Sequence, residues 1–258
     1  MTRKMISTWQ RNIIIGLVVA GSGLAATLGN MALAEAAKNR DKEAVRALIA
    51  QHADVNAAEP DGTTALHWAA HWNDADMAAA LIKAGANAKA VNRYTSTPLS
   101  EAAAKGSGNL VEMLLKSGAD PNTLATPEGE TVLMTAARNG NSEAVAALLS
   151  HKADVNTKEQ YKGQTALMWA AAEGNTDVVA ELIERGADMH AKTKGGFTPF
   201  LFAVREGHIG VVRTLVKAGV DVNETVQPGL ISGKKFAQVR AGPRPGTDRK
   251  STRLNSSH

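Results

Sequence analysis

Two histidines, His67 and His71, have the clearest potential for chemistry in this chain of 258 residues. They stand four positions apart, so on a helix both imidazoles would lie on one face and could bind one metal ion. The helix of a zinc protease carries the pattern HExxH, in which a glutamate follows the first histidine. Trp68 occupies that position here, and no third ligand is obvious. We therefore expect no metal site.

A glycine-rich segment near the N-terminus also imitates a functional site. Gly21 to Ala26 reads GSGLAA and follows an apolar stretch at 13–20, like a strand followed by the turn of a dinucleotide-binding fold. That pattern indicates a nucleotide site only inside a strand, helix, strand unit, and no second strand follows. The same residues fit a secretory signal, with a basic start, an apolar run and small residues in succession. We prefer the signal interpretation for residues 1–25.

The fate of this leader is open. Cleavage after Ala25 or Ala26 would release the mature protein. A retained leader would instead anchor it in the inner membrane, although glycines interrupt the apolar run and a membrane span needs about 20 apolar residues. The chain has no cysteine, which excludes a lipid-anchored lipoprotein and disulfide bonds. We expect a periplasmic or secreted bacterial protein, with an inner-membrane-anchored form as the alternative.

No other arrangement of residues suggests catalysis or cofactor binding. The sequence has no serine in a GxSxG setting, no cysteine and, after the leader, no glycine loop followed by a lysine. Those patterns are typical of enzymes that transfer acyl or phosphoryl groups. Paired carboxylates on rigid walls are also missing. We therefore expect no enzymatic activity and no cofactor.

The elements that hold these residues are copies of one unit, which recurs every 33 or 34 residues. Five copies open on a threonine followed by apolar residues and alanines, and these threonines are Thr64, Thr97, Thr131, Thr165 and Thr198. Six copies close on segments such as GADPN or GVDVN with the same spacing. A period of this length is typical of a solenoid, in which each unit packs on its neighbours.

Each copy is expected to form two short helices. In the second copy, apolar residues follow a helical period over 66–70 and again over 77–81, with turn-forming residues between them. The opening threonine is a natural N-cap for the first helix. The closing glycine stands where a helix ends in a left-handed residue. His52 and Lys152 replace it in two copies, at a cost of up to about 1 kcal/mol each.

These openings and closings resemble the ankyrin repeat family, whose copies follow a GxTPLHxAAxxGH opening and a GADVN closing. The resemblance implies an all-α solenoid of helix-turn-helix units with short β-turn fingers, in six repeats over 31–223 (31–56, 61–89, 94–122, 128–156, 162–190 and 195–223). Only the second copy keeps the family's histidine, as His67, for which the resemblance implies a structural hydrogen bond in the turn. Its counterparts are Ser100, Met134, Met168 and Leu201, so that bond must be absent or replaced there.

Both ends differ from the repeated body. The first copy lacks the threonine opening and has Glu35 where Trp68 and Trp169 stand later, which is typical of a polar N-terminal cap. We interpret residues 224–247 as a basic loop rich in glycine and proline, inserted before a truncated seventh repeat. Residues 248–258 resemble the in-frame translation of a sequencing adapter, and we leave them out of the fold.

The net charge of the chain must be divided before it is interpreted. The full sequence carries +4. Without the six basic residues and one acid of the leader and the adapter-like tail, the body has 23 basic and 24 acidic residues and a net charge of −1. A body so close to neutral gives no reason to expect a nucleic acid partner.

We expect function on the concave face of the stack, at the variable positions after the alanine pairs and at the fingers. The predicted partner-binding residues are His71, Trp72, Arg93, Tyr94, Lys105, Arg138, Asn139, Tyr161, Glu173, Lys194, Phe197, Arg205 and Glu206. An exposed Trp72 would be a typical interface anchor, and a partly covered ring is the alternative. For any single charged residue, an ordinary solvated surface is an equally good interpretation.

The resulting hypothesis is a monomeric, non-catalytic scaffold that is exported and binds another protein. Membrane contact would come only through an uncleaved leader. Two alternatives stay open, namely a membrane-anchored envelope component and the recognition part of a longer protein whose activity lies further toward the C-terminus. Fold alone does not identify a partner.

Overall fold

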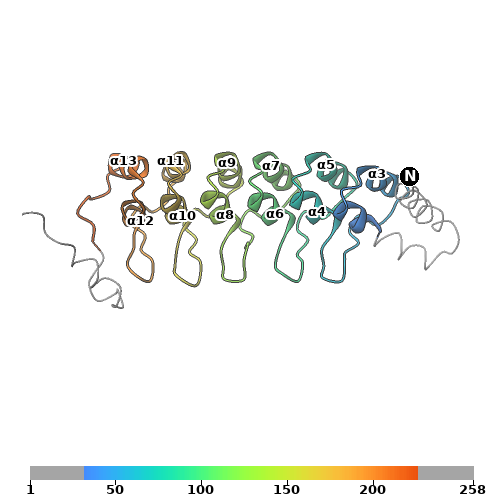
Figure 1. Ribbon diagram of the computed structural model, residues 1–258, viewed down its shortest axis with the longest axis horizontal. Coiled ribbons are helices and arrows are strands. Elements are labelled where there is room, and N and C mark those ends of the chain that lie inside the picture. The colour runs from blue at the N-terminus through green and yellow to red at the C-terminus, as the bar shows by residue number, and fades with distance from the viewer. Residues whose placement is uncertain (1–31, 226–258) are drawn as a thin grey trace, which may run out of the picture.

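The computed structural model describes residues 32–225, so the segments expected at 1–25 and 248–258, and nearly all of 224–247, lie outside this range. Pairs of helices stack side by side into an elongated array (Figure 1). A helix at 32–38 pairs with α3 (Lys42–Ala50). The following pairs are α4 (Ala65–His71) with α5 (Ala75–Lys83), α6 (Pro98–Ala104) with α7 (Gly108–Lys116), α8 (Val132–Arg138) with α9 (Ser142–Ser150), α10 (Ala166–Glu173) with α11 (Thr176–Glu184), and α12 (Pro199–Glu206) with α13 (Ile209–Lys217). The predicted all-α solenoid is confirmed.

Short polar side chains begin most of these helices. Four opening threonines, at α6, α8, α10 and α12, accept a hydrogen bond from the backbone N–H three residues later, which confirms their predicted role as N-caps. In the second helix of the second pair, Asp74 accepts from the N–H of Met77 at 3.1 Å. Each such cap contributes about 1 kcal/mol to stability, because it satisfies a donor that has no partner within the helix.

The core runs the length of the array and repeats with the helices. Each first helix from α4 to α10 supplies one leucine that is at most 1% exposed, namely Leu66, Leu99, Leu133 and Leu167. The alanine pairs of the same helices are 0% exposed. Alanine leaves room for the neighbouring helix to approach closely, so replacement by a larger residue would force the stack apart.

The turns after the second helices adopt the left-handed conformation that was predicted. Gly85 has a φ of 94°, and His52 and Lys152 hold the equivalent position at 59° and 70°. Glycine reaches this region without steric cost, whereas a residue with a Cβ does not. Each of the two non-glycine turns is therefore a site where glycine would add stability.

A short β-turn hairpin, which we call a finger, connects each repeat to the next. We number the fingers by the repeat they introduce: finger two (57–64), finger three (90–97), finger four (124–131), finger five (157–165) and finger six (191–198). Isolated β-bridges join Ala58 to Thr64 and Leu124 to Thr131. The fingers project from one side of the array, and the first helix of each pair lies between them and the second helix (Figure 1).

Candidate partner-binding surface

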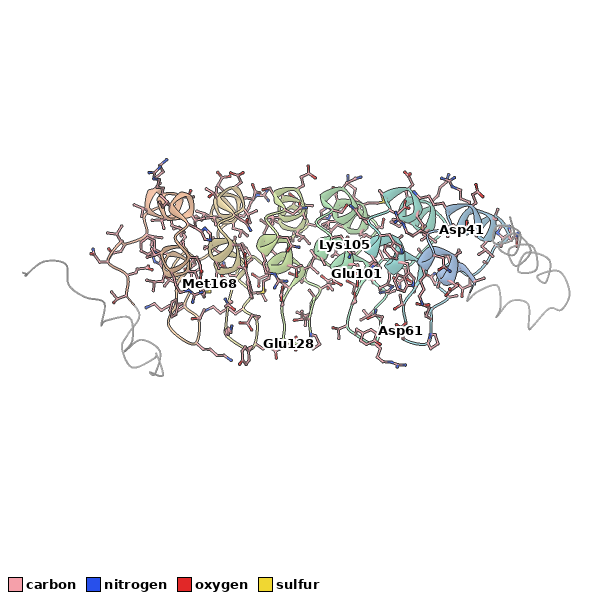
Figure 2. The ribbon with its side chains drawn as sticks, in the orientation of Figure 1. Asp41, Asp61, Glu101, Lys105, Glu128 and Met168 are labelled. Atoms are coloured by element: carbon pink, nitrogen blue, oxygen red, sulfur yellow. The ribbon has the colours of Figure 1, made fainter. Side chains whose placement is uncertain are left out.

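The candidate site is the surface formed by the fingers and the adjoining first helices, which we call the finger surface. Backbone hydrogen bonds link neighbouring fingers near their tips. Arg93 N–H donates to the Asp61 carbonyl at 2.7 Å, Gln160 N–H to the Glu128 carbonyl at 2.9 Å, and Lys194 N–H to the Lys162 carbonyl at 2.8 Å. Figure 2 shows Asp61 and Glu128 low on their fingers. These bonds hold finger two to finger three, and fingers four, five and six to one another.

The predicted contact residues lie on this surface, and each is exposed or partly exposed. Tyr161 and Tyr94 are the most open aromatic residues of the set, at 75% and 67% exposure. The helix positions are the ends of the first helices and their caps, at His71, Trp72, Lys105, Arg138, Asn139, Glu173, Arg205 and Glu206. The finger positions are Arg93, Tyr94, Tyr161, Lys194 and Phe197.

The structure gives several of these side chains an internal partner. The amide of Asn139 donates to the carbonyls of Ala103 and Ala104 at 3.3 Å, which ties one repeat to the one before it. Arg205 lies over the ring of Phe197, with 5.4 Å from the guanidinium carbon to the ring centroid. Asn139 therefore has a structural role that its sequence position did not reveal.

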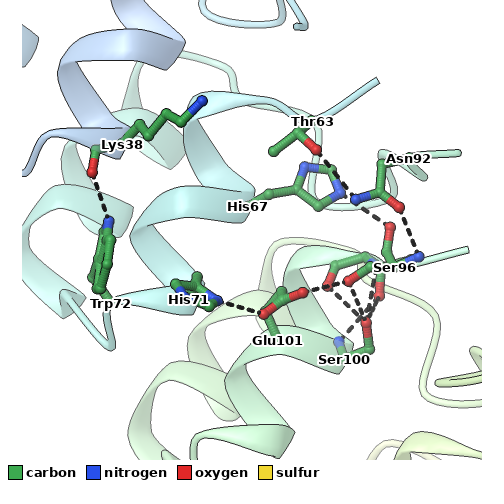
Figure 3. A network of polar contacts seen from close by, with 10 residues as sticks. Lys38, Thr63, His67, His71, Trp72, Asn92, Ser96, Ser100 and Glu101 are labelled. Carbon is green, nitrogen blue, oxygen red and sulfur yellow. Dashed lines mark hydrogen bonds and ion pairs between the residues drawn. The ribbon is translucent and has the colours of Figure 1, made fainter. Parts of the chain in front are cut away.

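Trp72 belongs to an aromatic cluster at the N-terminal end of the finger surface. Its ring stacks on Trp68, with centroids 6.4 Å apart, and meets His71 edge to face at 4.8 Å. Its indole N–H donates to the carbonyl of Lys38 at 3.1 Å (Figure 3). The guanidinium carbon of Arg40 lies 5.4 Å from the centroid of its ring. Trp72 remains 37% exposed, so its ring is partly covered but still accessible, and its role as an interface anchor stays a prediction.

His67 and His71 have different hydrogen-bond partners. Nδ1 of His67 accepts from the backbone N–H of Thr64 at 3.1 Å, and Nε2 lies 3.1 Å from the Ser96 carbonyl. Burial lowers the pKa of His67 below its usual 6.5, so the ring is neutral at neutral pH. His71 instead meets Glu101 at 3.0 Å (Figure 3). Among residues 32–225, no three metal-binding side chains come together.

The bond made by His67 is replaced in other repeats. The Ser100 hydroxyl accepts from the N–H of Thr97 at 2.8 Å, and the Met134 sulfur lies 3.4 Å from the N–H of Thr131. Both substitutes occupy the position equivalent to His67 and bond to the same N-cap residue. An acceptor other than histidine can therefore serve this turn, although the side chain of Leu201, at the same position in the sixth repeat, has no acceptor atom.

Trp68 and Trp169 have similar surroundings except at the indole nitrogen. Each is partly buried against the core and lies beneath a cation of the preceding repeat: the Lys38 ammonium is 5.3 Å from the Trp68 ring, and the Arg138 guanidinium is 5.1 Å from the Trp169 ring. Nε1 of Trp68 donates to the Glu59 carboxylate at 3.0 Å. Nε1 of Trp169 is buried and has no hydrogen-bond partner within residues 32–225.

Trp169 lacks an acceptor because the glutamate of finger five forms its hydrogen bonds within its own loop. Glu159 stands three residues after Asn156, as Glu59 does after Asn56. Its carboxylate accepts instead from the N–H groups of Tyr161, Lys162 and Gln164, at 2.5, 2.7 and 2.9 Å. In finger two a different residue closes the loop, because Asp61 accepts from the N–H of Thr63 at 2.9 Å. Glu59 is thereby free to reach Trp68.

The environment of Glu159 keeps it ionised. Burial alone would raise the pKa of this carboxyl group, but the surrounding backbone N–H donors outweigh burial and hold the pKa below its ordinary 4.5. The side chain therefore keeps its hydrogen bonds to its own loop at neutral pH. A cleft of about 230 Å³ lies beside it, lined by residues of fingers four and five and by Trp169.

Sequence reasoning did not identify the glutamates that organise this surface. Glu59, Glu130 and Glu159 are half-buried or buried in the fingers. Glu130 pairs with Arg138 at 3.0 Å and so fixes the cation over Trp169. Their positions were visible in the sequence, but the sequence does not show which of several nearby donors each carboxylate binds.

Comparisons with known proteins agree with this architecture. A family model described as ankyrin repeats (3 copies) matches residues 33–125, 99–193 and 133–226. The crystal structure of EF0377, an ankyrin repeat protein, is similar to this chain with a TM-score of 0.66 and 31% sequence identity, over 72% of this chain and 96% of that one. No curated protein matches the sequence. No helix in residues 32–225 is long and apolar enough to cross a membrane. The stacked helix pairs, the fingers and the family model together show that the chain belongs to the ankyrin repeat family.

Proposed function

We propose that this protein is an exported, non-catalytic scaffold that binds a partner protein on its finger surface. Ankyrin repeats generally mediate interactions between proteins. The observation that carries the proposal is the row of fingers linked by backbone hydrogen bonds, which presents aromatic and charged side chains in fixed positions. A surface that is ordered before binding loses little conformational entropy when a partner arrives.

The exposed side chains favour a partner of mixed polarity. Tyr94 and Tyr161 supply large, rigid contact area, which is common at interfaces. The charged members of the surface include both signs, as in Lys105, Glu173 and Lys194, so no single sign of charge dominates. This pattern favours a folded protein surface over a polyanion such as nucleic acid.

Export and the monomeric state belong to the same proposal and have their own tests. N-terminal sequencing of the protein recovered from the periplasm or medium would reveal a start at residue 26 or 27 if the leader is cleaved. A start at residue 1 in a membrane fraction would support the anchored alternative instead. Light scattering of the purified protein would show a single species of monomer mass.

Binding is tested by copurification from the periplasm of the producing bacterium. The variant Tyr94→Ala/Tyr161→Ala removes two open rings of the finger surface without touching the core. A matched control, Ile209→Ala/Val216→Ala, removes two exposed apolar side chains of α13, which are 65% and 39% exposed. We expect the first variant to lose the copurifying protein and the second to retain it. Equal retention by both variants would refute the finger surface as the binding site.

A further inference from the structure

The cleft between fingers four and five is lined by Trp169, which has an unused donor, and by Glu128, which has an unused acceptor. Nε1 of Trp169 is buried and has no hydrogen-bond partner among residues 32–225. The exposed carboxylate of Glu128 forms no hydrogen bond or ion pair with any residue from 32 to 225. The cleft of about 230 Å³ is far larger than the roughly 10–15 Å³ that one water molecule needs. Buried N–H groups without a partner are rare, because they cost free energy.

The entrance of this cleft is held in place by the backbone. Gln160 N–H donates to the Glu128 carbonyl at 2.9 Å, which links the two fingers. Arg138 covers the Trp169 ring from the preceding repeat and is itself fixed by Glu130 at 3.0 Å. These contacts hold the finger backbones and Arg138 in place before any ligand arrives, so binding requires only a small local shift to reach the indole nitrogen.

The charges of the lining select against an anion. Glu128, Glu130 and Glu159 line the cleft, and Lys162 is the cation among the lining residues. Arg138 offsets Glu130, while Glu159 is bonded to its own loop and stays ionised. A carboxylate or phosphate brought to Trp169 would face these acids, and like charges held close together weaken binding. The acceptor that suits Trp169 is therefore uncharged.

We propose that this cleft binds an amide group of the partner protein. The amide carbonyl accepts from Nε1 of Trp169, and the amide N–H donates to the carboxylate of Glu128. The inference rests on the proposed function in that the amide is supplied by a bound protein. Because Nε1 is screened from solvent, the indole or the finger shifts slightly as the amide enters, as interface side chains commonly do.

Finger two provides an internal comparison. Trp68 has the same cationic cover, but its Nε1 is already bonded to Glu59 at 3.0 Å. A ligand amide would have to displace a charge-assisted hydrogen bond there, which is stronger than a neutral one. The amide site is therefore specific to finger five, and Trp68 serves as a control within the same molecule.

Two amide sources share this chemistry, and small probes distinguish them. Acetamide represents the carboxamide of asparagine or glutamine, N-methylacetamide represents the peptide group, and acetate is the charged control. The full chain, labelled with ¹⁵N in its indole groups, is titrated with each probe, and the Nε1–H resonances are followed by NMR. Single substitutions of tryptophan by phenylalanine, including Trp169→Phe and Trp68→Phe, assign the signals.

We expect at least one amide probe to shift the Trp169 resonance saturably while the Trp68 resonance stays in place. The probe with the tighter response identifies the source, and acetate should bind at least about tenfold more weakly. The variant Glu128→Gln should weaken the amide response without changing the thermal unfolding of the protein. A response to acetate as strong as to the amides, equal shifts at Trp68 and Trp169, or no saturable shift would each overturn the proposal. These probes need no partner protein, so a failed copurification would not affect the outcome of this NMR titration.

Discussion

Finger two and finger five place a glutamate and a tryptophan at matching positions, but they connect them differently. In finger two, Asp61 closes the loop and Glu59 accepts from Trp68 at 3.0 Å. In finger five, Glu159 closes the loop through three backbone N–H groups and Trp169 is left without an acceptor. Finger two has two carboxylates for these bonds and finger five has one, so the single glutamate of finger five serves the loop and leaves the tryptophan unbonded. In finger five, the backbone N–H groups of the loop and the indole N–H of the tryptophan compete for the same carboxylate.

The largest expected effect comes from removing the glutamate that closes finger five. Glu159→Ala leaves three backbone donors without their acceptor, so we expect the free energy of unfolding to fall by about 3 kcal/mol. Urea denaturation followed by circular dichroism would measure it. Glu159→Gln keeps one acceptor oxygen and should recover part of the loss. A change below the error of the measurement would mean that the loop does not depend on this carboxylate.

Removal of the corresponding glutamate in finger two should cost less. Glu59→Ala deprives Trp68 of its acceptor and Lys38 of its ion-pair partner, and we expect a loss of about 1.5 kcal/mol in unfolding free energy. The loop itself should persist, because Asp61 closes it. A loss as large as that of Glu159→Ala, measured in the same urea titration, would contradict the division of roles between the two fingers.

The stability that Glu159 contributes should depend on pH. The pKa of Glu159 is held below its ordinary 4.5, so its contribution to stability is complete above that pH and declines as pH falls toward the lowered value. The stability gap between wild type and Glu159→Ala should therefore narrow between pH 5 and the acid limit of folding. A series of urea titrations across this range would show it. A gap that widens on acidification would refute ionised Glu159 as the closing group.

The smallest effect is expected from giving finger five the carboxylate that finger two has. Lys162 precedes Gln164 by two residues, as Asp61 precedes Thr63. In Lys162→Asp the new carboxylate can accept from Gln164 N–H, which partly releases Glu159 toward Trp169. We expect a few tenths of a kcal/mol in stability and slower hydrogen exchange at the Trp169 indole. Lys162→Ala, which removes the cation alone, should leave that exchange rate unchanged.

Much of the fold could be predicted from the sequence, because the repeat places the same residue type in the same environment several times. The threonine caps and the left-handed turns at His52 and Lys152 are local features, and a short stretch of sequence determines each. The finger networks are also built from nearby residues, but several donors compete for each carboxylate, so the sequence does not show which bond forms. Whether a glutamate bonds to its own loop or to a tryptophan depends on Asp61 or Lys162 nearby, and on one extra residue in finger five.

Distance along the chain limits what the sequence shows about the predicted partner-binding residues. Periodicity located the exposed positions after the alanine pairs, including Trp72 and Asn139. It could not show that both side chains donate to carbonyls of the preceding repeat, because those partners lie more than 30 residues away in the chain. The binding roles of these positions remain predictions.

The links between finger tips divide the surface into two mechanical units. Within residues 32–225, backbone hydrogen bonds join finger two to finger three and fingers four to six to one another, whereas no hydrogen bond joins finger three to finger four. Each group of fingers would therefore move as one plate, and the tips of fingers three and four could separate while α7 and α9 stay packed above them. A partner that spans both plates fixes the angle between them, while one that contacts a single plate leaves this joint free.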